Sequence, residues 1–195
     1  MSRSPFADKP TLVGTAVVLR PYVPSDLDAL HAAMRDPEVL RHTGGTPPPE
    51  QPDAAMRTWY ATRGAQADRL DLAVVDTASG ACVGEVVLNE VDEVARTASF
   101  RCFIGPGGRD RGLGTEAVRL LLQHAHAALP LDTITLEVHA DNPRARRVYE
   151  RAGFGETGRD VDEVAGEPVE VVLMTARRAA AGWSAAAPER SAGGR

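Results

Sequence analysis

The sequence predicts a single α/β domain, built on one mixed β-sheet with helices on both of its faces. Two observations favour this class. Strand-like runs come before the longest helix-like run, and a strand–helix alternation follows it, which is the order typical of a mixed sheet. The chain has 195 residues, of which 43% are hydrophobic and 25% are charged, the size and composition of an ordinary globular domain with one core.

The individual elements are expected in a definite order. Apolar-rich or alternating runs predict strands, at residues 15–20, 70–76, 81–88, 98–104, 134–140 and on either side of 164–167. Helical spacing of apolar residues predicts helices, at residues 24–35, around 56–60, at 115–129 and at 143–152. Two glycines and three consecutive prolines make residues 43–52 a loop. Residues 1–10 are expected to be an N-terminal tail, 11–178 the domain, and 179–195 a disordered C-terminal tail of alanine, glycine and polar residues.

The charge balance and the apolar pattern exclude several kinds of partner. The net charge is −5, whereas a nucleic-acid-binding surface is normally basic. No run is long and apolar enough for a signal peptide or a transmembrane helix. Cys82 and Cys102 lie in strand-like runs and are expected to be buried free thiols, and no His, Cys or carboxylate cluster has metal-ligand spacing. We therefore expect a cytoplasmic protein without metal, monomeric or homodimeric, that binds neither nucleic acid nor membrane.

The most informative local feature is a glycine-rich loop at residues 109–115, which read Arg-Asp-Arg-Gly-Leu-Gly-Thr before a long amphipathic helix. Glycines let the backbone approach a ligand closely, and the first turn of a helix offers unpaired N–H groups. Arg109 and Arg111 add positive charge. Since Lys9 is the only lysine, the arginines near 109–111 and 144–151 form the basic patch of an acidic protein. This pattern predicts a phosphorylated ligand.

Two other interpretations of this loop remain open, and a third is excluded. A Walker A loop is excluded, because Leu113 stands where that motif requires lysine. Residues 112–117 fit the dinucleotide pattern G-x-G-x-x-A, although the run before them is charged and is not a buried strand. An ordinary glycine-rich turn before a helix fits as well.

A second motif follows the predicted strand at residues 134–140. Residues 141–154 read Asp-Asn-Pro-Arg-Ala-Arg-Arg-Val-Tyr-Glu-Arg-Ala-Gly-Phe. Asn142 suits a helix N-cap, Pro143 the first helical position and Gly153 the residue after the helix. The spacing predicts a short helix with Val148 and Tyr149 on its apolar face.

Taken together, the R-x-x-G-x-G loop and the N-P-x-A-x-x-x-Y-x-x-x-G-F helix resemble those of the GCN5-related N-acetyltransferases, the GNAT family. The resemblance covers about residues 17–177 and is closest to the branch with the ribosomal-protein N-terminal acetyltransferases. It implies a mixed, mostly antiparallel sheet of six to seven strands with a splayed parallel pair. It also implies an enzyme that moves the acetyl group of acetyl-CoA to a primary amine, on a protein N-terminus or a small molecule, by direct attack in a ternary complex.

The resemblance implies two catalytic residues. Tyr149 matches the family tyrosine that donates a proton to the leaving thiolate of CoA, and its alternative role is that of a core aromatic. Glu85 lies on a mostly apolar strand, where the family often has a carboxylate base and where burial would raise its pKa toward neutrality. The alternatives are that Glu85 is a solvated strand residue, that it forms an ion pair with Arg101 on the next strand, or that a water chain is the base.

The resemblance also implies which residues hold the cofactor. Asn142 matches the asparagine that bonds the pantetheine arm, although an N-cap role explains it too. The strand end before Gly105 is where the family separates two parallel strands and exposes backbone groups. The cofactor-binding residues expected from these motifs are Phe103, Ile104, Arg109, Asp110, Arg111, Gly112, Leu113, Gly114, Thr115, Asn142 and Arg147.

Two rival functions remain beside acetyl transfer. The donor could be another acyl-CoA such as succinyl-CoA, and a non-catalytic acyl-CoA-binding module would keep the same loop. The motifs fix no particular amine, since acceptor loops vary freely on a fixed scaffold.

Overall fold

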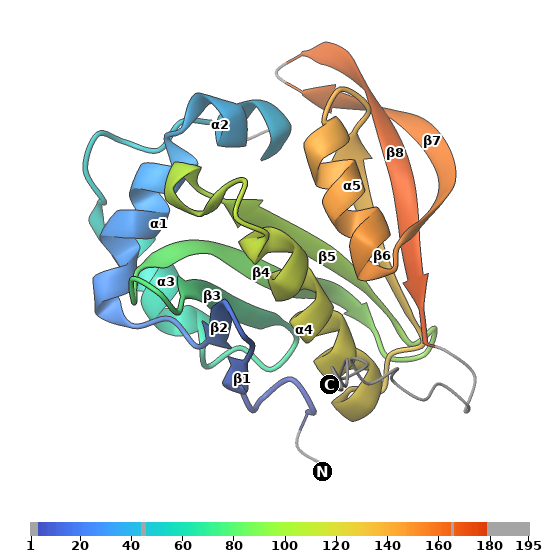
Figure 1. Ribbon diagram of the computed structural model, residues 1–195, viewed down its shortest axis with the longest axis horizontal. Coiled ribbons are helices and arrows are strands. Elements are labelled where there is room, and N and C mark those ends of the chain that lie inside the picture. Colours follow the sequence, from blue (N-terminus) through green and yellow to red (C-terminus); the bar gives the residue numbers. More distant parts are fainter. Residues whose placement is uncertain (1–3, 44–45, 165, 179–195) are drawn as a thin grey trace, which may run out of the picture.

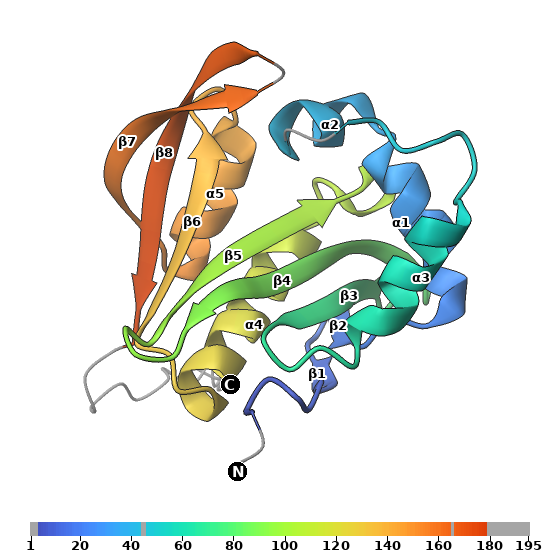
Figure 2. The same cartoon turned by 180° about the vertical axis from the view of Figure 1, so that it is seen from behind.

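One β-sheet runs through the molecule (Figures 1 and 2). The computed structural model describes residues 4–43, 46–164 and 166–178, so the predicted C-terminal tail lies outside the described residues. The described sheet has eight strands in the order β1-β2-β3-β4-β5-β6-β8-β7. Its strands are β1 (Leu12–Val13), β2 (Val17–Arg20), β3 (Leu70–Asp76), β4 (Cys82–Asp92), β5 (Thr97–Ile104), β6 (Thr133–His139), β7 (Gly155–Val164) and β8 (Glu167–Arg177).

The mixed, mostly antiparallel sheet is confirmed, because β5 and β6 form its one parallel pair among the described strands. The predicted count of six to seven strands is one too low. The additional strand is β1, which is two residues long and pairs antiparallel with β2. A two-residue strand has no periodicity that a sequence pattern can detect.

The prediction of an N-terminal tail is wrong for residues 4–10. Phe6 is 1% exposed and belongs to the main hydrophobic core. Lys9 donates hydrogen bonds to the carbonyl oxygens of Phe6, at 2.8 Å, and of Gln66, at 2.7 Å. One buried aromatic residue and one ammonium group therefore fasten this segment to the domain.

Helices cover both faces of the sheet, as the sequence predicts. Figures 1 and 2 show α4 and α5 on one face and α3 on the other. The main core lies between the sheet and helices α4 and α5. A smaller cluster joins Leu27, Leu30 and Tyr60 on the opposite face of the sheet. No described helix has both the length and the apolar character that crossing a membrane requires. The helices are α1 (Leu27–Met34), α2 (Pro37–Thr43), α3 (Ala54–Arg63), α4 (Leu113–Ala128) and α5 (Pro143–Ala152).

Helix α2 is absent from the sequence prediction, although its start carries a recognisable signal. The side chain of Asp36 accepts hydrogen bonds from the backbone N–H groups of Glu38 and Val39, at 3.2 and 3.1 Å. Pro37 occupies the first helical position. An acidic residue followed by proline is a helix-start pattern.

The parallel strands β5 and β6 pair only at their beginning. Their register joins Thr97 to Thr133, Ala98 to Ile134 and Ser99 to Thr135, and no later pair forms between the described strands. Both strands continue for four or more residues beyond that point, to Ile104 and His139. The splayed parallel pair implied by the sequence is therefore present, and it leaves a gap between the two strands.

Candidate active site

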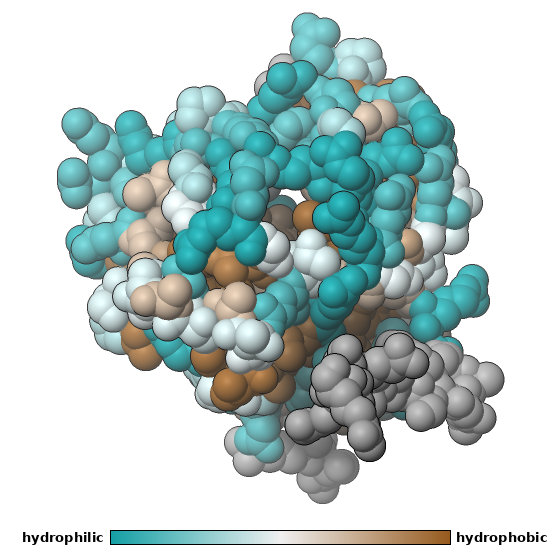
Figure 3. Space-filling view, viewed as in Figure 1, coloured by the Kyte–Doolittle hydropathy of each residue, from teal (hydrophilic) through white to brown (hydrophobic). Residues whose placement is uncertain are grey.

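A cavity of about 1030 Å³ is lined by residues from both splayed strands. Figure 3 shows a hollow, rimmed mainly by hydrophilic residues, on the face seen in Figure 1. On one side, which we call the α5 side, the lining comes from the loop before α4 and from α5. On the other, the α3 side, it comes from α2, α3 and strand residues that face them.

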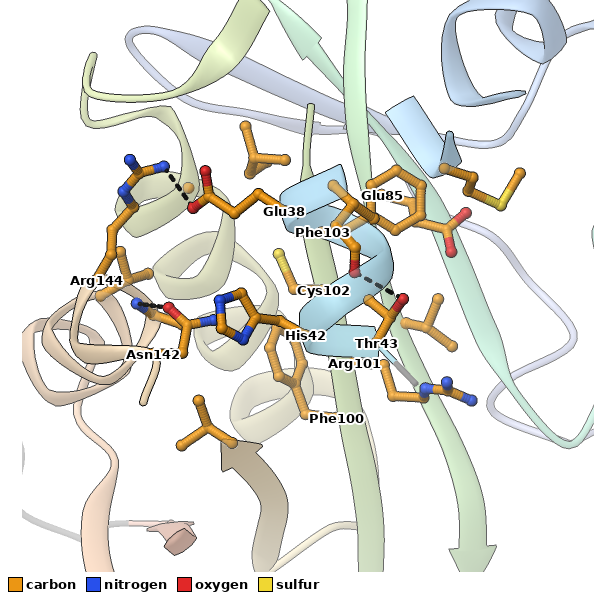
Figure 4. A pocket seen from close by; sticks show the side chains of 18 of the residues that line it. Glu38, His42, Thr43, Glu85, Phe100, Arg101, Cys102, Phe103, Asn142 and Arg144 are labelled. Carbon is orange, nitrogen blue, oxygen red and sulfur yellow. Dashed lines mark hydrogen bonds and ion pairs between the residues drawn. The ribbon is translucent and has the colours of Figure 1, made fainter. Parts of the chain in front are cut away.

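Glu85 on β4 lines the α3 side of the cavity (Figure 4). Two phenols bind its carboxylate. Tyr22 donates a hydrogen bond to Oε2 at 2.8 Å, and Tyr60 donates one to the same oxygen at 3.4 Å. Burial is the main reason that the pKa of Glu85 is raised to about 7, and the two phenols oppose this rise. A carboxyl group with this pKa can exchange protons near neutral pH.

The strand register places an arginine near this carboxylate. Glu85 lies opposite Phe103, and Val87 lies opposite Arg101, so all four side chains emerge on the same face of the β4–β5 pair. Among the described residues no ion pair joins Glu85 to Arg101, although the positive charge of Arg101 lowers the pKa of Glu85. The alternative of a structural ion pair between the two is therefore wrong.

Tyr149 on α5 approaches the cavity from the opposite face. Its ring makes edge contacts with Phe100 and Phe154, at centroid distances of 6.0 and 5.9 Å. Burial raises the pKa of the phenol, and the nearby thiol of Cys102 acts in the same direction. Tyr149 is thus a core aromatic, and at the same time it lines the cavity with a hydroxyl that stays protonated.

The loop before α4 has the backbone shape of an anion site. Asp110 and Gly112 have φ values of 58° and 80°, in the left-handed region, and α4 begins directly after them at Leu113. That start is two residues earlier than predicted. The N–H groups of the first helical turn have no partner within the helix, so they are free for a ligand. Gly114 lines the cavity, and a Cβ atom added there would meet only Ile104, at 3.4 Å.

The two arginines of this loop already have carboxylate partners. Arg109 binds Asp36 and Glu38, the latter at 3.1 Å, and its Nε donates to the carbonyl oxygen of Ile104. Arg111 binds Asp76 at 2.9 Å and does not line the described part of the cavity. Carboxylates from distant segments therefore hold both of the side chains that were expected to add positive charge for a phosphate.

The remaining predicted cofactor residues lie at or beside the α5 side. Asn142 accepts a hydrogen bond from the backbone N–H of Ala145 at 3.0 Å, so its side chain caps α5. Leu113 is 2% exposed and packs in the core, so only its backbone can meet a ligand. Arg147 is exposed and lines the cavity. The other residues of the set that line the cavity are Phe103, Ile104, Arg109, Asp110, Gly112, Gly114, Thr115 and Asn142.

A histidine cluster appears that sequence spacing did not predict. Possible ligand atoms of His42, His139 and Asp141 all lie within 4.8 Å of one another, although these residues have no metal-ligand spacing in the sequence. The rings of the two histidines meet edge to face, with centroids 5.6 Å apart. Arg41 also binds Asp141. These contacts join the end of α2 to the end of β6 and to the residue that precedes Asn142 (His42 and Asn142 are labelled in Figure 4).

Sequence reasoning missed several residues that line the cavity or bind a residue of its lining. Tyr22 lies outside every motif, and its partner Glu85 is 63 positions away. Arg144 binds Glu38 at 3.0 Å and so links α5 to α2 (Figure 4). The arginine-rich sequence of α5 was the one signal that pointed to Arg144. The same helix also contributes Arg151 to the cavity lining.

Comparison with known proteins agrees with this architecture. Residues 16–155 match the family model described as an acetyltransferase (GNAT) domain. A spermidine N(1)-acetyltransferase of Vibrio cholerae is 33% identical over 90 residues, which cover 46% of this chain and 52% of that protein. A putative ribosomal N-acetyltransferase, YdaF of Bacillus subtilis, is 31% identical over 83 residues, which cover 43% of this chain and 45% of that protein. The chain spans about half the length of these two relatives.

A solved structure shows the same fold over most of the chain. It is spermidine N-acetyltransferase of Vibrio cholerae, in complex with CoA and spermine. The TM-score is 0.74, and the match covers 85% of this chain and 97% of the other. At 23% sequence identity, this match describes the fold.

Proposed function

The chain belongs to the GNAT acetyltransferase family, and from that premise we propose that it transfers the acetyl group of acetyl-CoA to a primary amine. The amine attacks the thioester directly, with both substrates bound in the cavity. Acetyl-CoA binds on the α5 side and the amine on the α3 side. The solved relative from Vibrio cholerae that contains CoA and spermine supports this pairing of substrates.

One observation carries the proposal: a candidate base and a candidate acid lie on opposite faces of β5 at the gap. Glu85 is opposite Phe103 in the strand register, and Phe103 belongs to the cluster on the α3 side. Tyr149 packs with the main core on the other face, as does Cys102, the neighbour of Phe103 on β5. A thioester lying in the gap would therefore meet the amine and its base from one side and the acid from the other.

The loop before α4 would hold the pyrophosphate of acetyl-CoA. Successive N–H groups around Gly112, the positive end of the α4 dipole and the exposed guanidinium of Arg147 all favour an anion here. Arg109 and Asn142 have a different part in this arrangement. They order the loop and the start of α5 that surround the cofactor.

Glu85 would remove the proton that keeps the amine unreactive. An alkyl ammonium has a pKa of about 10, so little free amine exists at neutral pH. Oε2 of Glu85 is occupied by the two phenols, and Oε1 has no hydrogen-bond partner among the described residues. Oε1 is therefore the oxygen that can accept the proton. With a pKa of about 7, the carboxylate is present at neutral pH and is more basic than an ordinary glutamate.

The backbone of β5 and the hydroxyl of Tyr149 would stabilise the reacting thioester. Successive N–H groups of a strand point to opposite edges, so one N–H group of Phe103 and Ile104 faces the gap and can bind the oxyanion. As the C–S bond breaks, Tyr149 donates a hydrogen bond and then its proton to the thiolate. In balance, an ammonium and acetyl-CoA give an N-acetyl amine, CoA thiol and one proton.

The direct test combines donor binding with thiol release. Calorimetry with acetyl-CoA, succinyl-CoA and NAD should show micromolar or tighter binding for acetyl-CoA and weaker binding for the other two. Incubation with acetyl-CoA and a panel of amines should release CoA thiol in step with an acetylated amine, detected by mass spectrometry. Binding without acetylation of any amine would favour the non-catalytic module, and preferred binding of NAD would favour the dinucleotide interpretation.

A further inference from the structure

The α3 side of the cavity offers an apolar surface beside Glu85. Met56 and Trp59 of α3 and Phe103 of β5 line it. The indole of Trp59 is 38% exposed, and the guanidinium of Arg63 stacks on it, 3.9 Å from the ring centroid. An exposed indole on a cavity wall is suited to contact with an apolar part of a ligand.

Arg101 adds a positive charge to the same side of the cavity. It is exposed, and its guanidinium forms no ion pair or hydrogen bond within the described part of the chain. Arg69 also lines this side, but Asp71 neutralises it through two hydrogen bonds of 2.7 Å. A guanidinium that lines a cavity and makes no ion pair or hydrogen bond with the described residues is suited to a carboxylate or a carbonyl oxygen of a ligand.

The strand register puts the two charged groups within reach of one ligand. Glu85 and Arg101 are diagonal neighbours across the β4–β5 pair, so their backbone positions lie about 7–8 Å apart. Their side chains leave the same face of the sheet and both line the cavity. This placement suits a ligand that carries both an amine and an oxygen acceptor.

A polyamine fits this arrangement poorly. Its ammonium groups lie far apart along a flexible chain, and the one nearest Arg101 would meet a like charge. Glu38 is already bound by two arginines. The other carboxylates of the lining are Asp110, Glu137 and Asp162. Asp110 lies 3.7 Å from Arg144, so a polyamine would have to use Glu137 and Asp162, on β6 and β7.

We infer that the acceptor is an amine that also carries a carboxylate or carbonyl oxygen and an apolar side chain. This inference rests on the proposed function. The amine faces Oε1 of Glu85, the neighbouring oxygen binds Arg101, and the side chain packs against Trp59 and Met56. A free amino acid and the N-terminus of a peptide share this chemistry.

Matched acceptors and one charge variant test the inference. Thiol release is measured with phenylalanine, phenethylamine, which lacks the carboxylate, and spermidine. Wild type should use phenylalanine best, by about tenfold or more over phenethylamine, the difference expected for a hydrogen bond to a charged group. Arg101→Gln should raise KM for phenylalanine and remove this difference, without changing the affinity for acetyl-CoA. Because Arg101 also lowers the pKa of Glu85, wild type and variant are compared at about pH 9, where the carboxylate is ionised in both. Arg57→Gln, on the exposed part of α3 outside the cavity lining, is the control.

The panel also separates the two sources of an α-amine. Phenylalaninamide and a peptide that begins with phenylalanine should react at least as well as phenylalanine if a peptide N-terminus is the acceptor, and worse if a carboxylate is needed. A wild-type preference for spermidine, lost in Glu137→Gln, would overturn the inference while upholding the proposed function. So would an equal effect of Arg101→Gln on phenylalanine and phenethylamine. Failure of every amine to be acetylated would instead overturn the proposed function.

Discussion

Tyr22 donates its hydrogen bond to the same carboxylate oxygen of Glu85 as Tyr60, at 2.8 Å against 3.4 Å. Both phenols thus hold one oxygen and leave the other for a ligand. Burial and the nearby carboxylate of Glu85 raise the pKa of each phenol well above its ordinary value, so neither competes as a base. The protonation of Glu85 alone should govern how this side of the cavity responds to pH.

Replacement of Glu85 by glutamine should abolish this response. In wild type, kcat/KM should rise with pH through an apparent pKa near 7, the value for Glu85. Glu85→Gln should lower the rate most near neutrality and recover at high pH, where more of the amine is already deprotonated. Two amines of different basicity should be compared, since a limb that moves with the amine belongs to the substrate. Wild-type rates for Glu85→Gln at every pH would point to a water chain as the base.

Removal of the Tyr22 hydroxyl should shift the same limb to higher pH. The hydrogen bond from Tyr22 stabilises the carboxylate and lowers the pKa of Glu85, so Tyr22→Phe should raise it. Tyr60→Phe is the matched variant and should cause a smaller shift, because its bond is longer. The measurement is the pH profile of kcat/KM for each variant, with melting temperature as a check on folding. A profile that stays in place for Tyr22→Phe would contradict a direct bond to the base.

The raised pKa of Glu85 also has a consequence for stability. Its value rises from 4.5 in the unfolded chain to about 7 in the fold, so the folded protein binds more protons between these pH values. The contribution of Glu85 to the free energy of unfolding should therefore fall as pH rises from about 4.5 to 7, and then level off. Urea denaturation at pH 5 and pH 8 should show that Glu85→Gln becomes more stable relative to wild type at the higher pH. A constant difference between the two proteins would contradict the raised pKa.

Tyr149→Phe removes a hydroxyl and leaves the aromatic contacts with Phe100 and Phe154 in place. Acetyl-CoA affinity and melting temperature should change little. Turnover should fall about tenfold to a hundredfold, which corresponds to roughly 1.4–2.7 kcal/mol of lost transition-state stabilisation. Steady-state kinetics at saturating substrates measure this, and a pre-steady-state burst shows whether chemistry limits the rate. A large fall in melting temperature with unchanged turnover would leave Tyr149 with only its packing role.

Gly114→Asp should weaken acetyl-CoA binding at least about tenfold, because its carboxylate would enter the cavity and repel a phosphate across a short distance. The protein itself has room for the added Cβ atom, which meets only Ile104. Gly107→Asp is the matched control, since the same change there meets nothing within 4 Å and lies outside the described cavity lining. Calorimetry that gives equal affinities for the two folded variants would move the phosphate site elsewhere.

Local patterns in the sequence predicted much of the fold. The motif at Asn142, Pro143 and Gly153 predicted both ends of α5, because capping depends on neighbouring residues only. The strands that surround the cavity were predicted from apolar-rich or alternating runs, which are also local patterns. Helix α2 was not predicted, although Asp36 and Pro37 mark its start. The helix is short, and a proline-rich loop follows it directly in the sequence.

Long-range pairing explains what the sequence could not predict. Arg109 lies in a phosphate-type loop, yet its charge is taken by Asp36 and Glu38, more than 70 positions earlier. No local pattern distinguishes that arginine from Arg147, which remains exposed. The same limit applies to Tyr22 and its bond to Glu85, which only the packing of the segment before α1 against β4 brings about.

The gap between β5 and β6 is also a weak seam in the interior of the sheet. Three residue pairs join these strands, against seven between β4 and β5 and seven between β6 and β8. Strands β1–β5 and the unit of β6, β7 and β8 are therefore joined mainly through this short ladder and through helix packing. A molecule bound across the gap contacts both units, so its binding energy opposes their separation. By mass action, a free ligand concentration of a hundred times Kd would add about 2.7 kcal/mol to the free energy of unfolding. The domain would therefore be most resistant to unfolding while its cavity is occupied.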